Sequence, residues 1–295
     1  MIYICVLNYK NPGDTIKCCD SLLKLQEKNY RILLVDNASP DDSVNILSEY
    51  TQKYTEKIVF FASKINLGYA GGNNVALRYA MEQTDCEYVW VLNNDTLVDS
   101  SSLSWLIDFM EKHPRVGLCG SKLVYSWDHS KVQGYGGKYN RWLGVSSTFN
   151  KEKDIPHIDF VIGAAVFVRR SFLEQVGLMN EEYFLYFEEL DWAQRAKGKF
   201  LLGCEPRSIV YHKEGASIGA NAKRPEDKSE LADYYSMRNR LLFTKKFFPE
   251  CLLTVYMSSV VMLWNRLRRH QYRRVWSYIK LLLGIKDEKF EPRIK

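Results

Sequence analysis

Three clusters of polar and acidic residues in this sequence could carry chemistry, and the first is Asn93-Asn94-Asp95. It directly follows an apolar run. An aspartate beside two amides can hold a hard divalent cation through oxygen, and Mg²⁺ or Mn²⁺ in such sites takes few protein ligands and completes its shell with substrate phosphates. The same residues also suit an Asx turn at the end of a strand, which is the simpler interpretation of the spacing alone.

The second cluster is a glycine-rich turn, Asn66-Leu67-Gly68-Tyr69-Ala70-Gly71-Gly72-Asn73-Asn74. Glycines allow backbone amides to approach a phosphate, and the start of a helix favours its negative charge. The turn lacks the Gly-Lys-Ser/Thr of a Walker loop and the spacing of a dinucleotide fingerprint. An ordinary loop followed by a helix that begins at a glycine explains the pattern equally well.

The third cluster places three carboxylates in Glu188-Glu189-Leu190-Asp191. Asp191 precedes Arg195 by four residues, so a surface ion pair is one explanation. The aromatic run 183–187 comes just before and could exclude water, which would raise the pKa of a carboxyl group and suit it to act as a general base. His212 follows an apolar run, but a lone histidine is more often structural than a metal ligand.

These clusters must be positioned by an alternating α/β framework. Continuous apolar runs at 3–7, 32–35, 58–61 and 88–92 predict strands buried on both faces, and helix-like segments at 15–26, 41–54 and 72–82 separate them. This order predicts a mostly parallel sheet with right-handed crossovers. Ligands bind at the carboxyl ends of such strands, and polar residues follow each of the four runs: Asn8, Asp36-Asn37, Asn66 and Asn93-Asn94-Asp95.

The remaining segments are less regular. Ser39-Pro40-Asp41-Asp42 predicts a helix start with a capping hydroxyl. Residues 125–149 predict a loop or hairpin excursion, and 160–168 a strand. Residues 188–197 predict a helix, and 201–212 predict two short strands around a turn at Pro206. From residue 228 to 283 the pattern is helical.

Composition narrows the class of protein. The chain has 295 residues, 46% hydrophobic and 26% charged, which is typical of a globular protein. The net charge of +6 says little about nucleic acid. Seven cysteines without a CxxC spacing predict reduced thiols and a cytoplasmic protein. We find no signal peptide and no apolar stretch long enough to span a membrane.

Taken together, the motifs resemble the family-2 glycosyltransferases, and within them the bacterial rhamnosyltransferase-like branch. The resemblance covers about residues 2–245 and rests on six motifs in order: Val35-Asp36-Asn37-Ala38-Ser39, Asn66 to Asn73, Leu92-Asn93-Asn94-Asp95, Gly163-Ala164-Ala165, Phe184 to Asp191, and His212 with Gly215 and Ser217. It implies a GT-A fold, which is a Rossmann-like, mostly parallel sheet flanked by helices. It also implies a metal-bound nucleotide-sugar donor and inversion at the anomeric carbon.

The resemblance implies roles for individual residues. Asp95 matches the last acid of the family's DxD motif and would bind Mn²⁺ or Mg²⁺ with His212, although Asn93 cannot supply a carboxylate at the first position. Glu189 matches the catalytic base, with Glu188 as the alternative, and we also expect Asp191 among the catalytic residues. Asp36 would contact the nucleoside. The other residues expected around the donor are Asn8, Asn37, Asn66, Gly68, Gly71, Gly72, Asn73 and Asn94.

We therefore expect a catalytic domain at 1–227 and a helical extension at 228–295. The donor would be a dTDP- or UDP-sugar, and the acceptor a saccharide or a lipid-linked saccharide in cell-surface polysaccharide synthesis. Arginines and tryptophans interleave after residue 264, which suits either the inner face of a membrane or packing within the chain or a homo-oligomer. No RNA-binding module accompanies them. The alternatives are a non-catalytic nucleotide-sugar-binding scaffold and a nucleotidyltransferase.

Overall fold

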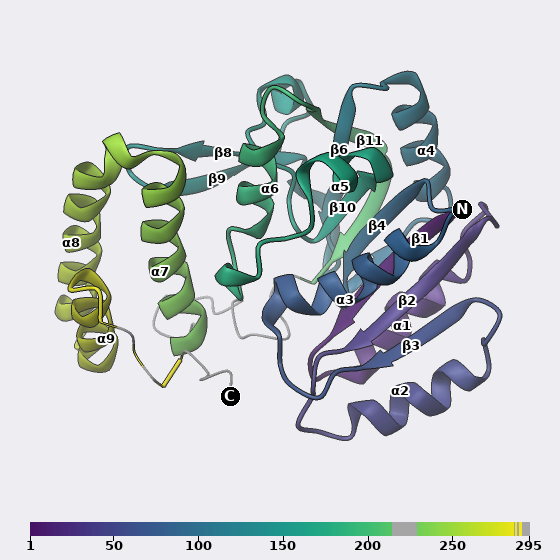
Figure 1. The fold of residues 1–295 in the computed structure, drawn as a ribbon, viewed down its shortest axis with the longest axis horizontal. Helices are drawn as coiled ribbons and strands as arrows, with labels where there is room; N and C mark the ends of the chain where they lie inside the picture. The colour runs from purple at the N-terminus through teal and green to yellow at the C-terminus, as the bar shows by residue number, and fades with distance from the viewer. Residues whose placement is uncertain (214–228, 286, 288, 291–295) are drawn as a thin grey trace.

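The computed structural model describes residues 1–213, 229–285, 287 and 289–290. It shows a mixed sheet covered by helices on both faces, with α7, α8 and α9 beside it (Figure 1). Gly215 and Ser217, two of the motif residues expected from the sequence, lie outside the described residues.

The first half of the chain forms the parallel part of the sheet, as predicted. Its strands pair in the order β3-β2-β1-β4. β1, β2 and β4 are buried because helices cover both faces, whereas β3 lies at the edge and is mostly half-buried, contrary to the prediction for residues 58–61. The elements are β1 (Ile2–Asn8), α1 (Pro12–Leu22), β2 (Tyr30–Asp36), α2 (Ser43–Gln52), β3 (Ile58–Ala62), α3 (Gly68–Glu82) and β4 (Tyr88–Asn93).

The second half makes the sheet mixed. β10 lies between β4 and β6 and runs antiparallel to both, so the full order is β3-β2-β1-β4-β10-β6-β11-β5. These elements are β5 (Thr96–Val98), α4 (Ser102–Lys112), β6 (Val116–Tyr125), β7 (Asp128–Gly134), β8 (Gly136–Asn140), β9 (Val145–Phe149), β10 (Ala165–Arg169), α5 (Arg170–Val176), α6 (Glu188–Ala196) and β11 (Leu201–His212). The C-terminal helices are α7 (Glu230–Phe247), α8 (Leu252–Arg268) and α9 (Tyr272–Leu282).

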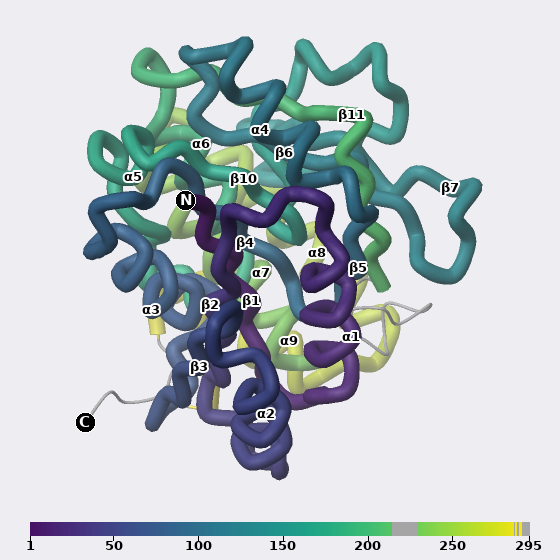
Figure 2. The backbone as a smooth tube through the Cα atoms, turned by 90° about the vertical axis from the view of Figure 1, so that its right-hand side faces the viewer, coloured from purple at the N-terminus to yellow at the C-terminus, as the bar shows by residue number. Residues whose placement is uncertain are grey.

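Alternate side chains of the central strands supply two cores, one on each face. Ile4 and Trp90 pack in the core that includes residues of α1, α2 and α4. Cys5 and Val89 pack in the core that includes residues of α3, α5 and α6. Figure 2 shows α1 and α3 on opposite sides of β1 and β2. This two-sided burial is why the strands are continuous apolar runs in the sequence.

Several predicted boundaries were wrong. α3 begins at Gly68 rather than at residue 72, and Leu67 is its N-cap residue. The predicted strand at 160–168 is confined to Ala165–Arg169. Residues 201–212 form one strand, β11, with an irregular register between Glu205 and Ile209 in place of a turn. The Ser39 hydroxyl donates to Asp36 and caps no helix, because α2 starts only at Ser43. The excursion at 125–149 contains β7, β8 and β9.

Candidate active site

A buried hydrogen-bond network joins the polar residues at the ends of β1, β2 and β4. Asn8 donates from Nδ2 to Oδ2 of Asp36 over 2.7 Å, and its Oδ1 accepts from the Thr15 hydroxyl over 2.6 Å. Nδ2 of Asn94 donates to the same hydroxyl oxygen over 2.9 Å. The structure therefore brings Asn8, Asp36 and Asn94 together, as the parallel sheet predicts. The side chains of Asn8 and Asp36 are fully buried, so they hold the strand ends in place.

The next link connects β2 to α3 through Asn37. Its Nδ2 donates to Oδ1 of Asn66 and to the carbonyl oxygen of Gly68, both over 3.0 Å, and its Oδ1 accepts from the Leu67 amide over 2.9 Å. Asn37 and Asn66 thus satisfy the backbone groups that the start of α3 leaves open. The first turn of α3 is held at the carboxyl end of the sheet.

The glycines of this turn allow close packing. A Cβ on Gly72 would lie 2.5 Å from Cδ1 of Leu7, and one on Gly71 would lie 2.7 Å from Cβ of Leu67. Gly68 has φ 71° and lies against Phe184, whose carbonyl oxygen accepts from the Tyr69 amide over 2.6 Å. Asn73 is buried on α3, and its Oδ1 has no hydrogen-bond partner in the structure.

Asp95 and His212 are neighbours at the end of β4 and β11. Nε2 of His212 lies 3.2 Å from Oδ1 of Asp95, and both residues are buried. The other ring nitrogen, Nδ1, lies 3.0 Å from Oε1 of Gln133 on β7. A proton on Nδ1 would be donated to Gln133, which leaves a lone pair on Nε2 facing a carboxylate. A proton on Nε2 or a bound cation would each make this contact favourable.

This pair fits a divalent cation with few protein ligands. Among residues 1–213 and the described part of the C-terminal segment, no three His, Cys, Asp or Glu side chains could hold a metal ion together. A cation here would take Asp95 and His212 and complete its shell with phosphate or water oxygens, as Mg²⁺ and Mn²⁺ commonly do. Oδ1 of Asn93 beside them is buried without a hydrogen-bond partner, as expected where a polar ligand belongs.

Glu189 lies next to Gly163. A Cβ on Gly163 would lie 3.8 Å from Cδ of Glu189 and 3.8 Å from the Tyr69 hydroxyl, which donates to the Gly163 carbonyl oxygen over 2.7 Å. Gly163 therefore leaves the carboxyl group of Glu189 uncovered on that side. Burial, and then the charges of Glu188, Glu189 and Asp95, raise the pKa of the Tyr69 hydroxyl, so all three acids surround Tyr69.

The two adjacent glutamates differ in exposure. Glu188 is 1% exposed, and its Oε1 has no hydrogen-bond partner, whereas Glu189 is partly exposed. Burial and the neighbouring Glu189 charge raise the pKa of Glu188 well above its ordinary value, and burial raises the pKa of Glu189. Of the two, Glu189 is the one that combines a raised pKa with partial exposure.

The loop before these glutamates has a strained backbone and is held in place by residues of α7. Phe184, Tyr186 and Phe187 have φ values of 62°, 71° and 76°, which cost free energy in residues other than glycine. Asn239 is fully buried, and its Nδ2 lies 2.7 to 3.0 Å from the carbonyl oxygens of three loop residues, Tyr183, Leu185 and Tyr186. Tyr235 stacks on Phe184 with ring centroids 4.8 Å apart. α7 therefore helps to hold the glutamates in position.

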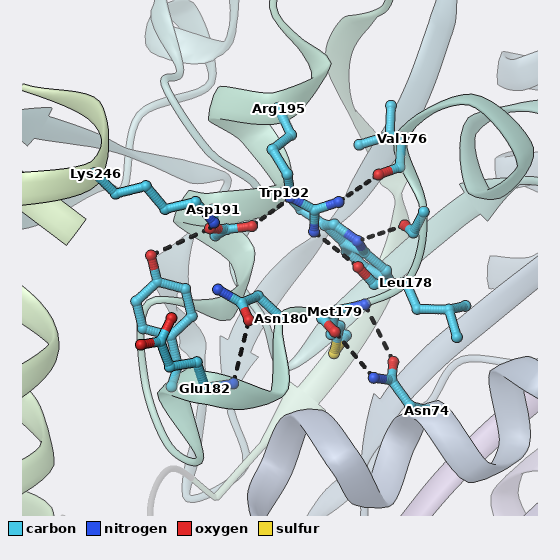
Figure 3. A network of polar contacts seen from close by, with 12 residues as sticks. Asn74, Val176, Leu178, Met179, Asn180, Glu182, Asp191, Trp192, Arg195 and Lys246 are labelled. Atoms are coloured by element: carbon cyan, nitrogen blue, oxygen red, sulfur yellow. Dashed lines mark hydrogen bonds and ion pairs between the residues drawn. The ribbon is translucent and has the colours of Figure 1, made fainter. Parts of the chain in front are cut away.

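Asp191 lies in a separate ion network, shown in Figure 3. Its fully buried carboxylate pairs with Arg195 and, over 2.6 Å, with Nζ of Lys246 on α7. Oδ2 also accepts from the Tyr183 hydroxyl over 3.1 Å. Arg195 in turn donates to the carbonyl oxygens of Val176 and Leu178. With its oxygens engaged in this way, Asp191 joins α6 to α7 and to the segment after α5.

Sequence reasoning missed four residues that complete this arrangement: Tyr69, Gln133, Asn239 and Lys246. Tyr69 lies within the glycine-rich motif, which was the signal that could have found it. Gln133, Asn239 and Lys246 gave no signal, because their partners are 79, 53 to 56 and 55 positions away in the chain.

The chain is similar to several known glycosyltransferases. The hexosyltransferase of low-salt glycan biosynthesis from Haloferax volcanii is 22% identical over 99% of this chain and 88% of its own length. The N-acetylglucosaminyl-diphospho-decaprenol L-rhamnosyltransferase of Mycobacterium tuberculosis is 26% identical over 68% of this chain and 71% of its own length. A mannosyltransferase from Pyrobaculum calidifontis, solved with GDP-Man and Mn²⁺, superposes with a TM-score of 0.57 at 12% identity, over 96% of this chain and 74% of its own.

The structural likeness shows the fold, which is GT-A as expected from the motifs, with C-terminal helices added. The family model described as "Glycosyl transferase family 2" matches residues 2–177, more than half of the chain. That stretch contains the asparagine network, the glycine-rich turn and Asp95, while Glu189 and His212 follow it. The chain belongs to glycosyl transferase family 2.

Proposed function

We propose that this protein is a metal-dependent, inverting glycosyltransferase that uses a nucleoside-diphosphate sugar, with dTDP- or UDP-linked rhamnose or another hexose as the donor. Two observations support the proposal: Asp95 contacts His212, and Glu189 lies beside Gly163, whose carbonyl oxygen accepts from Tyr69. A cation site and an accessible carboxyl group of raised pKa are what sugar transfer from a diphosphate requires. A glycosidase also uses two carboxylates but needs no diphosphate site.

In this proposal Asp95 and His212 hold the divalent cation, which supplies charge neutralisation for the departing diphosphate. Glu189 accepts the proton of the acceptor hydroxyl. The hydroxyl oxygen forms a bond to the anomeric carbon as the bond from that carbon to the diphosphate breaks, and the nucleoside diphosphate leaves. Attack from the face opposite the diphosphate inverts the configuration. The proton transfer contributes about 10²–10⁴ in rate.

The other predicted residues take supporting roles. Asn8, Asp36 and Asn94 hold the strand ends, and Gly71 and Gly72 allow α3 to approach Leu7. Asn73, with its unpartnered Oδ1, is the residue of this turn that we assign to the donor. Asp191 positions α6 through Arg195 and Lys246. The family resemblance assigned the nucleoside contact to Asp36. In this proposal the loop that Asp36 holds in place makes that contact instead.

For the acceptor we propose a saccharide hydroxyl, either free or lipid-linked, in cell-surface glycan synthesis on the cytoplasmic side. The mycobacterial relative is named for a decaprenol-linked acceptor, and the haloarchaeal relative for glycan biosynthesis. None of the helices in the described part of the chain has the length and apolarity needed to cross a membrane.

Thermal unfolding of the protein with UDP, dTDP and GDP, each with and without Mn²⁺, tests the proposal. Binding to the native state raises the unfolding midpoint by mass action, so one diphosphate should raise it only with the cation. With the matching donor, the protein should release nucleoside diphosphate. Glu189→Gln should keep the shift and lose turnover by about 10²–10⁴, while Glu49→Gln, an exposed glutamate on α2, should keep both.

Other outcomes would support different functions. Release of pyrophosphate would indicate a nucleotidyltransferase. A shift without turnover by any donor and acceptor would indicate a binding scaffold. Loss of turnover in Glu188→Gln with full activity in Glu189→Gln would move the base to Glu188.

A further inference from the structure

The helix α8 is apolar on two opposite faces. Val255 and Ser259 are buried on the face that meets the other C-terminal helices. The opposite face carries five apolar side chains that are 53% to 72% exposed: Leu253, Met257, Val260, Val261 and Trp264. A helix on the surface of a globular protein normally turns polar residues outward. Figure 1 shows α8 at the outer edge of the molecule, beyond α7.

The spacing makes this outer face a continuous stripe. Residues 253, 257, 260 and 264 recur every three to four positions, so they line one side of the helix over about 16 Å at ~1.5 Å per residue. Aromatic side chains extend the exposed apolar surface into α9, where Tyr272 and Trp276 are each 60% exposed. We call these seven residues, 253, 257, 260, 261, 264, 272 and 276, the apolar stripe.

The positive charge of the protein is concentrated beside the apolar stripe. The chain has 41 basic and 35 acidic residues, and residues 252–285 hold six of the basic and none of the acidic ones. The rest of the chain therefore has 35 of each sign and no net charge. The whole excess of +6 belongs to α8, α9 and the turn between them.

Three of these six cations serve the fold. Arg266 and Arg274 pair with the buried Asp233 of α7, and Lys280 pairs with Asp287. The other three, Arg268, Arg269 and Arg273, are exposed at the end of α8 and the start of α9. Exposed arginines therefore lie next to exposed tryptophans at the same corner of the molecule.

We propose that the apolar stripe and these three arginines form a docking surface for an anionic lipid bilayer. Helices that lie in a membrane interface combine an apolar face with arginines and with tryptophan or tyrosine, which favour the headgroup region. A second copy of the chain fits less well, because its own α8 and α9 offer no acidic side chain to pair with these arginines. A nucleic acid would leave the aliphatic side chains of the stripe exposed.

The docking surface is joined to the candidate active site through α7. Arg240 of α7 donates to the Ser258 hydroxyl on α8, and Asn239, its neighbour in sequence, holds the loop before Glu188. Docking would thus hold the site at the membrane surface, where a lipid-linked acceptor lies. The docking proposal does not depend on sugar transfer, because lipid binding is measurable without turnover.

Cosedimentation of the full chain with vesicles tests the proposal. We expect binding to vesicles of phosphatidylcholine with phosphatidylglycerol and little binding to phosphatidylcholine alone. The double variant Met257→Gln, Trp264→Gln should lower binding by about tenfold or more, since it removes apolar surface without changing charge. The triple variant Arg268→Gln, Arg269→Gln, Arg273→Gln should lower it roughly fivefold per arginine, and added salt should do the same.

Matched controls separate the docking surface from general effects. Ile46→Gln with Trp127→Gln removes an exposed apolar pair elsewhere, and Lys24→Gln, Lys53→Gln, Lys199→Gln removes three exposed cations elsewhere. Both should bind as the unchanged protein does. Failure of the unchanged protein to bind anionic vesicles would overturn the proposal, as would equal losses in the controls. So would a dimer by light scattering that Met257→Gln, Trp264→Gln converts to a monomer, because a second copy would then cover the stripe.

Discussion

Nε2 of His212 lies 3.2 Å from Oδ1 of Asp95, although the two residues are 117 positions apart in the chain. The arrangement arises because β11 runs antiparallel beside β5, the strand that follows Asp95, and His212 pairs with Thr96. Both side chains are buried, so their contact is largely shielded from water. This pair is the part of the site most directly open to test.

Removing either member of the pair should remove cation binding. We expect Asp95→Asn and His212→Ala to abolish the Mn²⁺-dependent rise in unfolding midpoint with the nucleoside diphosphate, and Gln133→Ala to weaken Mn²⁺ binding by about 10–100-fold because it orients the ring of His212. Asp108→Asn, at a surface ion pair, is the control. A full Mn²⁺ response in Asp95→Asn would place the cation elsewhere.

The raised pKa of Glu188 predicts a pH-dependent stability. The unfolded chain releases the Glu188 proton near the ordinary glutamate pKa of about 4.3, whereas the folded protein releases it at a higher pH. The free energy of unfolding should therefore fall as the pH rises through the pKa of the folded protein. Glu188→Gln cannot ionise and should be more stable than the unchanged protein at neutral pH. The advantage should vanish at acidic pH. Urea unfolding across this range would show it, and equal stabilities at every pH would contradict it.

The raised pKa of Glu189 predicts the pH at which kcat/KM falls on the acidic side of its pH profile. A general base acts when ionised, so kcat/KM should fall with decreasing pH around a midpoint above the ordinary glutamate value. Donor binding, measured by thermal shift, should not follow this midpoint. A profile with its limb at or below about 4.3 would assign proton transfer to a different group.

Asn239 is expected to act as a positioning residue. Asn239→Ala removes the amide that holds three carbonyl oxygens of the strained loop, so it should lower the free energy of unfolding by about 1–3 kcal/mol. Because the loop precedes Glu189, kcat should fall more than KM rises. Asn265→Ala, on the exposed side of α8, should change neither. Lost stability with an unchanged kcat would mean that Asn239 is only structural.

The packing role of the glycines in the glycine-rich turn can be tested by measuring the stability of alanine variants. A Cβ on Gly72 would lie 2.5 Å from Cδ1 of Leu7 and 3.2 Å from Cγ of Asn37, so Gly72→Ala should cost about 1–3 kcal/mol of stability. Gly13→Ala is the matched helical control, because nothing lies within 4 Å of its added Cβ, and it should be neutral or stabilising. Chemical denaturation compares the two. If Gly72→Ala leaves the stability unchanged, the reason for a glycine at this position would be the close approach of a phosphate rather than packing.

The sequence by itself determined the parallel half of the sheet and the family. Strands buried on both faces must be apolar along their whole length, so β1, β2 and β4 were visible as runs, and the polar residues after them pointed to one edge. The edge strand β3 was also visible as an apolar run, although it is only half-buried. The helical character after residue 228 was also visible. These signals are local, because hydrophobic period and turn chemistry depend on neighbours in the chain.

Only the tertiary structure decided how the site is completed. The antiparallel insertion of β10, the continuity of β11 past Pro206 and the early start of α3 depend on pairings between distant segments. The same is true of Gln133 beside His212 and of Asn239 beside the loop that precedes Glu188. A side chain's partner across 50 or more residues is set by packing of whole elements, and no local pattern in the sequence records it.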